Sequence, residues 1–297
     1  MDCGAFADRL PACFPGGDLL ADAPVDRRFR AVVDRVDGMS TEHSLTLLNL
    51  AASLLGPDET YLEVGSYRGR SLVGAALGQA HDRFLAIENF REFGLDPARS
   101  ERLLRAALRD WDVADRVTFR RGDAFRLIPR GVVTRPVGVY FYDGAHSRLA
   151  QYLALGLVEP LLADEALVVI DDASWPQVTR ATAAYLARHP GYRLLFDLRA
   201  ERAEDPRWCN GVAVYQWRRP NRHRARPRLD LAWRRPAHLY LHEPAMTLAW
   251  RVLPRHPRLS ALLKRLYLHG GSEVPAGAHT PTGPATPAEP PATGTNA

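Results

Sequence analysis

The strongest constraint on the fold is a glycine turn, within residues 60–71, that joins an apolar strand to a helix. The strand at 61–64 runs into Gly65 and Gly69, and a helical pattern begins directly after them. A dinucleotide fingerprint reads Gly-x-Gly-x-x-Gly, and its second glycine lets a pyrophosphate approach the backbone. That position holds Tyr67 in this chain. The turn therefore disfavours a nicotinamide cofactor and suits a ligand without phosphates.

Strands and helices alternate after this turn. Strands are predicted at 61–64, 83–88, 116–121, 137–142, 165–170, 192–197 and 211–217, and helices at 70–80, 99–110, 147–162 and 175–189. Short continuous apolar runs such as 166–170 are typical of buried parallel strands. The last two strands have no helix between them, so we expect them to pair antiparallel. This pattern predicts an α/β, doubly wound sheet that binds ligands at the carboxyl ends of its strands.

The chain divides into four segments by composition. Residues 1–57 form an N-terminal helical segment, with an irregular start and helices at 26–36 and from Ser40 or Thr41 to Gly56. Residues 58–217 form the main domain. Residues 218–269 are a basic, Arg- and Pro-rich extension with an amphipathic helix predicted at 258–268. Residues 270–297, rich in Pro, Gly, Thr and Ala, are predicted to be disordered.

Composition excludes several other classes of protein. The chain of 297 residues has ordinary hydrophobic content (46%) and only three cysteines, which form no paired framework, so we expect a reducing compartment. The N-terminus lacks the basic and apolar regions of a signal peptide, and no apolar run is long enough to span a bilayer. We therefore expect a cytoplasmic protein.

The net charge of +5 is unevenly distributed along the chain. Residues 1–217 hold 26 Arg against 30 acidic residues, a balance of −4, whereas residues 218–268 hold 13 basic and 2 acidic residues, a balance of +11. The extension therefore has three readings: an appendage packed on the acidic body, a weak membrane-surface contact, or a nucleic-acid contact. No recognised nucleic-acid motif supports the third, so nucleic acid is disfavoured as a partner.

Acidic residues end the second and third strands. Glu88 lies 23 residues after Gly65, where a carboxylate can accept hydrogen bonds from ribose hydroxyls. Asp123 follows the third strand, beside Ala124. The alternative readings are a solvated acid at a strand end for Glu88 and a helix cap for Asp123.

Three carboxylates end the fourth and fifth strands. Asp143 follows one strand, and the pair Asp171 and Asp172 follows the next. Neighbouring parallel strands end at one edge of the sheet, so these groups should converge. Uncompensated, they would raise one another's pKa, and Mg²⁺, which prefers oxygen ligands, would relieve that repulsion. The alternative reading is a turn at Asp143 and a helix cap at Asp172 or Ser174.

Taken together, these motifs resemble those of class I S-adenosylmethionine (SAM) methyltransferases, over about residues 58–217. The glycine turn, Glu88, the Gly-Asp at 122–123, Asp143 and the pair at 171–172 occur in the expected order. The acidic set resembles the metal site of Mg²⁺-dependent O-methyltransferases, which include the catechol, caffeoyl-CoA and macrocin types. The run 142–147 also resembles the Asp-Gly-Asp-His-Ser pattern of the cephalosporin-hydroxylase-like branch.

The resemblance implies a Rossmann-like sheet of seven strands with an antiparallel last strand, and it assigns roles to residues. SAM would be held by Glu63, Gly65, Ser66, Tyr67, Gly69, Ser71, Glu88, Asp123, Ala124 and Asp143. Glu63 would face the methionine end and Asp123 the adenine amino group. Mg²⁺ would be held by Asp143, Asp171 and Asp172.

One departure from the family pattern concerns the general base. The sugar-modifying branch usually has a second Asp two residues after the first metal Asp, where this chain has Ala145. The catechol branch has a Lys one residue further on, where this chain has His146. A histidine there could take a proton from a hydroxyl group near neutral pH. We therefore predict His146 as the base, with a ligand or supporting role as the alternatives. Asp143 is the second predicted catalytic residue, through the metal that would hold the acceptor oxygen.

The predicted activity is SAM-dependent methyl transfer to a hydroxyl of a small molecule, with Mg²⁺-assisted deprotonation. The run 142–147 favours a sugar or glycosylated metabolite over a catechol-type phenol. Two further hypotheses are an RNA methyltransferase that uses the basic extension, and a SAM-fold binding protein that has lost catalysis, for which Ala145 is the hint. The N-terminal helices and the loop 198–210 are expected to cover the acceptor site.

Overall fold

The fold is built on a seven-stranded mixed sheet with the order β3-β2-β1-β4-β5-β7-β6. The computed structural model describes residues 1–91, 96–200, 202, 204–220, 229–252 and 256. The strands are β1 (Thr60–Val64), β2 (Phe84–Glu88), β3 (Val117–Arg121), β4 (Val137–Tyr142), β5 (Leu162–Ile170), β6 (Tyr192–Leu198) and β7 (Val212–Arg218). The first five pair parallel, and β7 pairs antiparallel with both β5 and β6. The predicted Rossmann-like sheet with its reversed last strand is confirmed.

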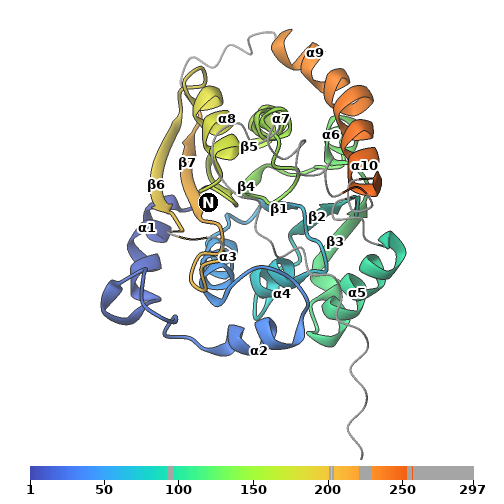
Figure 1. Cartoon of the computed structure of the whole chain (residues 1–297). Coiled ribbons are helices and arrows are strands. Elements are labelled where there is room, and N and C mark those ends of the chain that lie inside the picture. Colours follow the sequence, from blue (N-terminus) through green and yellow to red (C-terminus); the bar gives the residue numbers. More distant parts are fainter. Residues whose placement is uncertain (92–95, 201, 203, 221–228, 253–255, 257–297) are drawn as a thin grey trace, which may run out of the picture.

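Helices cover both faces of this sheet (Figure 1). On one side lie α1 (Cys3–Ala12), α2 (Arg28–Arg35), α3 (Glu42–Ser53), α4 (Arg70–Ala76) and α5 (Pro97–Asp110). On the other lie α6 (Ala124–Leu127), α7 (Arg148–Val158), α8 (Pro176–Leu186), α9 (Leu229–Ala237) and α10 (Glu243–Val252). Short 3-10 turns occupy Pro15–Gly17, Ala114–Arg116, Ile128–Arg130 and Glu159–Leu161.

Each face of the sheet has its own apolar core, because side chains alternate along a strand. Tyr61 on β1 belongs to the cluster under α1 to α5, and its neighbour Leu62 belongs to the cluster under α6 to α9. All five residues of β1 and all six of β4 are buried, as expected for central strands covered on both sides. The carboxyl ends of these two strands are therefore rigid supports for the residues that follow them.

The irregular start predicted for the N-terminal segment is wrong, because residues 3–12 form the helix α1. The Asp2 side chain accepts a hydrogen bond from the Ala5 N–H and caps this helix. Cys3, Phe6 and Leu10 lie at helical spacing and are buried. The pattern is short and contains Pro11, which obscured it in the sequence. The helices predicted at 26–36 and after Thr41 are α2 and α3.

The basic extension contains helices that the sequence pattern did not indicate. After α9, a π-helical turn (His238–His242) leads into α10. Pro236 lies inside α9, and the missing N–H of a proline removes a helical hydrogen bond, so its presence argued against a helix. Buried Leu231 and Leu239 join the core that α7 also lines, which gives this segment tertiary support.

Other predicted boundaries shift by a few residues. The helix predicted to 162 ends at Val158, and β5 begins at Leu162 rather than at 165. The helix predicted at 258–268 and the tail at 270–297 lie outside the described residues, and membrane contact through 218–268 stays a prediction. Among the helices that the structure describes, none combines the length and apolarity needed to cross a bilayer.

Candidate functional site

The glycine turn after β1 lies directly against the loop after β4. Gly65 has φ +95°, and a Cβ added there would lie 1.9 Å from the Asp143 carbonyl oxygen. The Asp143 N–H donates to the Val64 carbonyl at 2.9 Å, which fixes the two loops to each other. Gly69, with φ +93°, is the N-cap of α4. Glycine is therefore required at Gly65 both by the backbone conformation and by the close approach of Asp143.

Glu63 is a fully buried carboxylic acid on the α4 side of β1. Its oxygens accept hydrogen bonds from the Tyr61 and Ser71 hydroxyls, each at 2.9 Å. Burial raises the pKa of Glu63 to about 7, although the hydroxyl donors act to lower it. The predicted cofactor residues Glu63 and Ser71 thus lie together behind the glycine turn, with Ser66 also buried there.

Because Glu63 is buried, the free energy of unfolding should decrease as the pH rises from about 4.5 to about 7. Below pH 4.5 both the folded and unfolded states hold the proton; above it the unfolded chain releases its proton first, so the free energy of unfolding falls until the pH reaches about 7. The full effect is about 3 kcal/mol. Denaturant unfolding of the wild type and of Glu63→Gln from pH 4 to 8 measures this effect. The two proteins have all other carboxyl groups in common, so the difference between their pH profiles is due to Glu63. Parallel pH profiles for the two proteins would contradict the assignment.

Glu88 ends β2 and faces the same turn. One of its oxygens accepts the Tyr67 N–H at 2.9 Å, and the other accepts the Phe90 N–H. Tyr67 has φ +46°, so a non-glycine residue holds a left-handed conformation at this turn. Burial raises the pKa of Glu88, and the backbone donors oppose that rise. The predicted ribose acceptor is therefore fixed against the glycine turn rather than free in solvent.

Asp123 caps a helix, which was the alternative reading at this position, and one of its carboxylate oxygens takes no part in that cap. Its Oδ1 accepts the Phe125 N–H at 2.8 Å and caps α6, which begins at Ala124. Its Oδ2 is buried and has no hydrogen-bond partner among the described residues. Burial raises the pKa of Asp123, as expected for a carboxyl with few donors. The capping oxygen orients the side chain, and the second oxygen remains available for a ligand.

An acidic cluster lies at the carboxyl ends of β4 and β5. Asp143, His146 and Asp172 each offer one ligand atom, and these atoms lie within 4.8 Å of one another. The His146 Nε2 lies 2.9 Å from Asp172 Oδ2 and 3.6 Å from Asp143 Oδ1. The ring of Trp175 packs edge-on against His146, with centroids 5.1 Å apart. Two carboxylates and an imidazole in this arrangement can bind a divalent cation or move a proton.

Asp171, the third predicted metal ligand, is not part of this three-residue group. Burial, and then the charge of Asp172, raise the pKa of Asp171 to about 7, while contacts with His146 and Asp143 lower it. Burial is thus the main cause of this raised pKa, and the charge of Asp172 adds to it. The group that the structure gathers contains His146 in its place.

Asn210 is a site residue that sequence reasoning missed. Its amide nitrogen donates to Asp172 Oδ1 at 2.8 Å, which leaves the other oxygen of Asp172 toward His146. Asp172 has φ +51°, a strained conformation that this contact helps to hold. Asn210 precedes Gly211 in the loop before β7, and only that turn-type pair marks it in the sequence.

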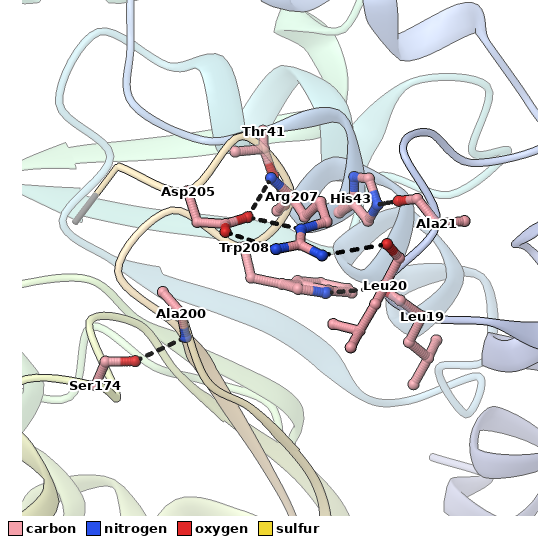
Figure 2. Close-up of polar contacts among 10 residues, drawn as sticks. All are labelled: Leu19, Leu20, Ala21, Thr41, His43, Ser174, Ala200, Asp205, Arg207 and Trp208. Carbon is pink, nitrogen blue, oxygen red and sulfur yellow. Dashed lines mark hydrogen bonds and ion pairs between the residues drawn. The ribbon is translucent and has the colours of Figure 1, made fainter. Parts of the chain in front are cut away.

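The loop that carries Asn210 is bound to the N-terminal segment (Figure 2). Trp208 Nε1 donates to the Leu19 carbonyl at 2.9 Å, and Thr41 donates its hydroxyl hydrogen to the Arg207 carbonyl. Arg207 also pairs with buried Asp205, and these contacts lower the pKa of Asp205 to about 2. The N-terminal segment and the loop after β6 are therefore joined next to the acidic cluster.

Trp208 should be the main anchor of this loop. It is 1% exposed and packs against Phe14 and His43. We expect Trp208→Ala to lower the free energy of unfolding by about 3–5 kcal/mol through the cavity it leaves. Trp233→Ala is the matched control, because that ring is 59% exposed and its loss should cost at most about 0.5 kcal/mol. Denaturant unfolding measures both, and equal midpoints for the two variants would show that the loop is not anchored this way.

The fold is that of the class I, Rossmann-like methyltransferases. It is defined by the order of the strands, by the glycine turn after β1 and by the acidic residues at the strand ends. A family model described as a methyltransferase domain matches residues 62–173, from β1 to just after the acidic pair. Residues 62–173 thus match a methyltransferase domain, set in a sheet that has the strand order of the class I methyltransferase fold. A comparison with curated proteins finds no match.

Solved structures share the fold at low sequence identity. Cofactor-bound Rv0187 from MTB is 19% identical, over 74% of this chain and 97% of its own, with a TM-score of 0.50. A protein from Corynebacterium glutamicum is 15% identical, over 67% of this chain and 93% of its own, with a TM-score of 0.50. The O-methyltransferase from Bacillus cereus in complex with SAH is 13% identical, over 66% and 92%, with a TM-score of 0.49. At such identities the likeness concerns the fold alone.

Proposed function

We propose that the chain transfers the methyl group of SAM to a hydroxyl of a small molecule, a sugar or glycosylated metabolite. One observation carries this proposal: Asp143, His146 and Asp172 converge beside Gly65. The turn predicted to hold SAM and the loop that carries groups able to deprotonate an alcohol are in direct contact. A methyl donor and an activated oxygen would therefore meet at this point.

The donor groups around the glycine turn fit the adenosyl cofactor. Asp123 Oδ2 is a buried acceptor without a partner among the described residues, which suits the amino group of adenine. Glu88 is oriented by two backbone N–H groups, which suits hydrogen bonds from ribose hydroxyls. Glu63 and Ser71 lie behind the turn, on the side assigned to the methionine end. These contacts support the predicted cofactor residues as a set.

The donor chemistry of the acidic cluster also fits a divalent cation. Asp143 and Asp172 would hold it, with Asp171 as the third predicted carboxylate beside them. A bound Mg²⁺ would supply positive charge that lowers the pKa of an acceptor hydroxyl. Asn210 holds Asp172 in place by its hydrogen bond to Oδ1. The hydrogen bond from the Asp143 N–H to the Val64 carbonyl holds the backbone of Asp143 in place.

His146 would receive the proton of the acceptor hydroxyl. The neighbouring carboxylates Asp143 and Asp172 stabilise the protonated ring that results. Trp175 packs against the imidazole and limits its movement. Because the sulfonium leaving group is good, most of the rate must come from holding the oxygen in line with the methyl carbon. The N-terminal segment and the 204–211 loop, joined through Trp208, are the elements that would cover the acceptor.

Calorimetric titration with S-adenosylhomocysteine (SAH) tests the cofactor, with NADH as the control ligand and with each titration repeated with and without Mg²⁺. We expect SAH to bind and NADH not to bind. A screen of glycosides and catechols then identifies the acceptor, and a chelator should abolish turnover while SAH still binds. NADH binding in place of SAH would overturn the proposal, and full turnover in chelator would remove the metal from it.

A further inference from the structure

The C-terminal helical segment, residues 229–252, contacts α6, the short helix that follows β3. The Arg235 Nε donates to the Phe125 carbonyl at 2.8 Å. The ring of His238 packs edge-on against the ring of Phe125, with centroids 4.3 Å apart. Phe125 is the residue whose N–H is bonded to Asp123. The segment therefore contacts, through both backbone and side chain, the turn predicted to hold adenine.

Two buried polar side chains at this contact have atoms without a hydrogen-bond partner among the described residues. They are Asp123, 5% exposed and unpartnered at Oδ2, and His238, 1% exposed and unpartnered at both ring nitrogens. Burial, and then His242, lower the pKa of His238 to about 4, so its ring is neutral near pH 7. A neutral imidazole has one donor and one acceptor. Unpaired buried groups of this kind are costly unless a ligand satisfies them.

The surroundings of His238 include charged side chains as well as the ring of Phe125. Glu243 lies 3.9 Å from the His238 Nε2 and 3.7 Å from Arg91. Burial, and then the charge of Asp123, raise the pKa of Glu243. Arg91 follows β2, and Glu243 begins α10, so groups from both sides of the sheet edge meet here. Figure 1 shows α10 beside the edge formed by β2 and β3.

We propose that the segment 229–252 forms the outer wall of the adenine site, where His238 hydrogen-bonds the adenosyl group and Arg235 positions the turn Asp123–Phe125. This inference rests on the proposed function, since it concerns the same cofactor. An adenine ring offers a donor at its amino group and acceptors at its ring nitrogens. Asp123 Oδ2 matches the donor, and the neutral His238 can match an acceptor or a donor. The basic extension is thereby part of the cofactor site.

The test uses the full chain with His238→Phe and Arg235→Ala. His238→Phe keeps a ring against Phe125 and removes both nitrogens, so stability should be unchanged or higher while SAH binding weakens about tenfold. Arg235→Ala should also weaken SAH binding about tenfold. The wild type should bind SAH more tightly than S-inosylhomocysteine, which lacks the amino group, and this preference should shrink in both variants. Calorimetry gives the affinities, and thermal unfolding reports the folded state.

Leu248→Ala is the control, because its side chain is on the same segment and 63% exposed. It should bind SAH like the wild type. Wild-type SAH affinity and unchanged preference in His238→Phe would overturn the inference and leave the proposed function standing. Failure of the wild type to bind SAH would instead overturn the proposed function, and the inference with it. If Arg235→Ala does not fold, His238→Phe decides the question alone.

Discussion

Replacing His146 with alanine is expected to lower turnover about 10²- to 10⁴-fold, the usual range for loss of a general base. His146 lies beside both Asp143 and Asp172, so the variant would remove the proposed proton acceptor near the predicted metal position. Affinity for SAH should change little, because the contacts of Glu88 and Asp123 are separate from this ring. Single-turnover kinetics and SAH calorimetry on the same preparation measure the two effects.

Two further measurements separate a base from a metal ligand at this position. If His146 is the base, added imidazole should restore part of the turnover of His146→Ala, and the Mg²⁺ concentration for half-activation should stay the same. If His146 binds the metal, imidazole should fail and the half-activation concentration should rise. His81→Ala is the matched control, since that partly buried histidine bonds to the Ala52 carbonyl away from the cluster. Undiminished turnover of His146→Ala would refute both roles.

The sheet was predictable from sequence because each central strand is buried on both faces. The run 166–170 is continuous and apolar, and it lies within β5 with all five residues buried. The N-terminal helix α1 and the segment α9–α10 were not predictable in the same way. Both contain a proline, Pro11 and Pro236, and both are stabilised by packing against distant elements rather than by local pattern. Tertiary contacts outweighed weak local signals there.

Part of the candidate site could also be predicted from the sequence, and part could not. Asp143 and Asp172 follow neighbouring strands, so the topology alone brings them together, and their proximity could be predicted. The backbone of Asp172 is left-handed, and the group contains His146 instead of Asp171; strand order indicates neither of these two facts. Asn210 comes from the loop before β7, 38 residues further along, and no spacing rule connects it to Asp172. The sequence pattern does not show in which direction a side chain points, or which distant loops contact each other.

Replacing Gly65 with alanine is the second change with a large expected effect. The left-handed φ of +95° costs an alanine about 1–2 kcal/mol. The added Cβ would also lie 1.9 Å from the Asp143 carbonyl oxygen, and overpacking of this kind costs about 1–3 kcal/mol or more. We therefore expect Gly65→Ala to lower the free energy of unfolding by about 2–5 kcal/mol. SAH binding should be lost as well, because the turn must move.

Gly131→Ala separates the two causes, since Gly131 has φ +81° and a Cβ there would meet no atom within 4 Å. It should cost only about 1–2 kcal/mol and leave SAH binding intact. Because the clash at Gly65 is with the backbone of Asp143, relief of it must displace a predicted metal ligand. Gly65→Ala should therefore impair Mg²⁺ activation even where the protein still folds. If the two variants unfold at the same denaturant midpoint, the glycine turn and the acidic cluster are not rigidly joined. Another contact would then have to align the cofactor site with the acceptor site.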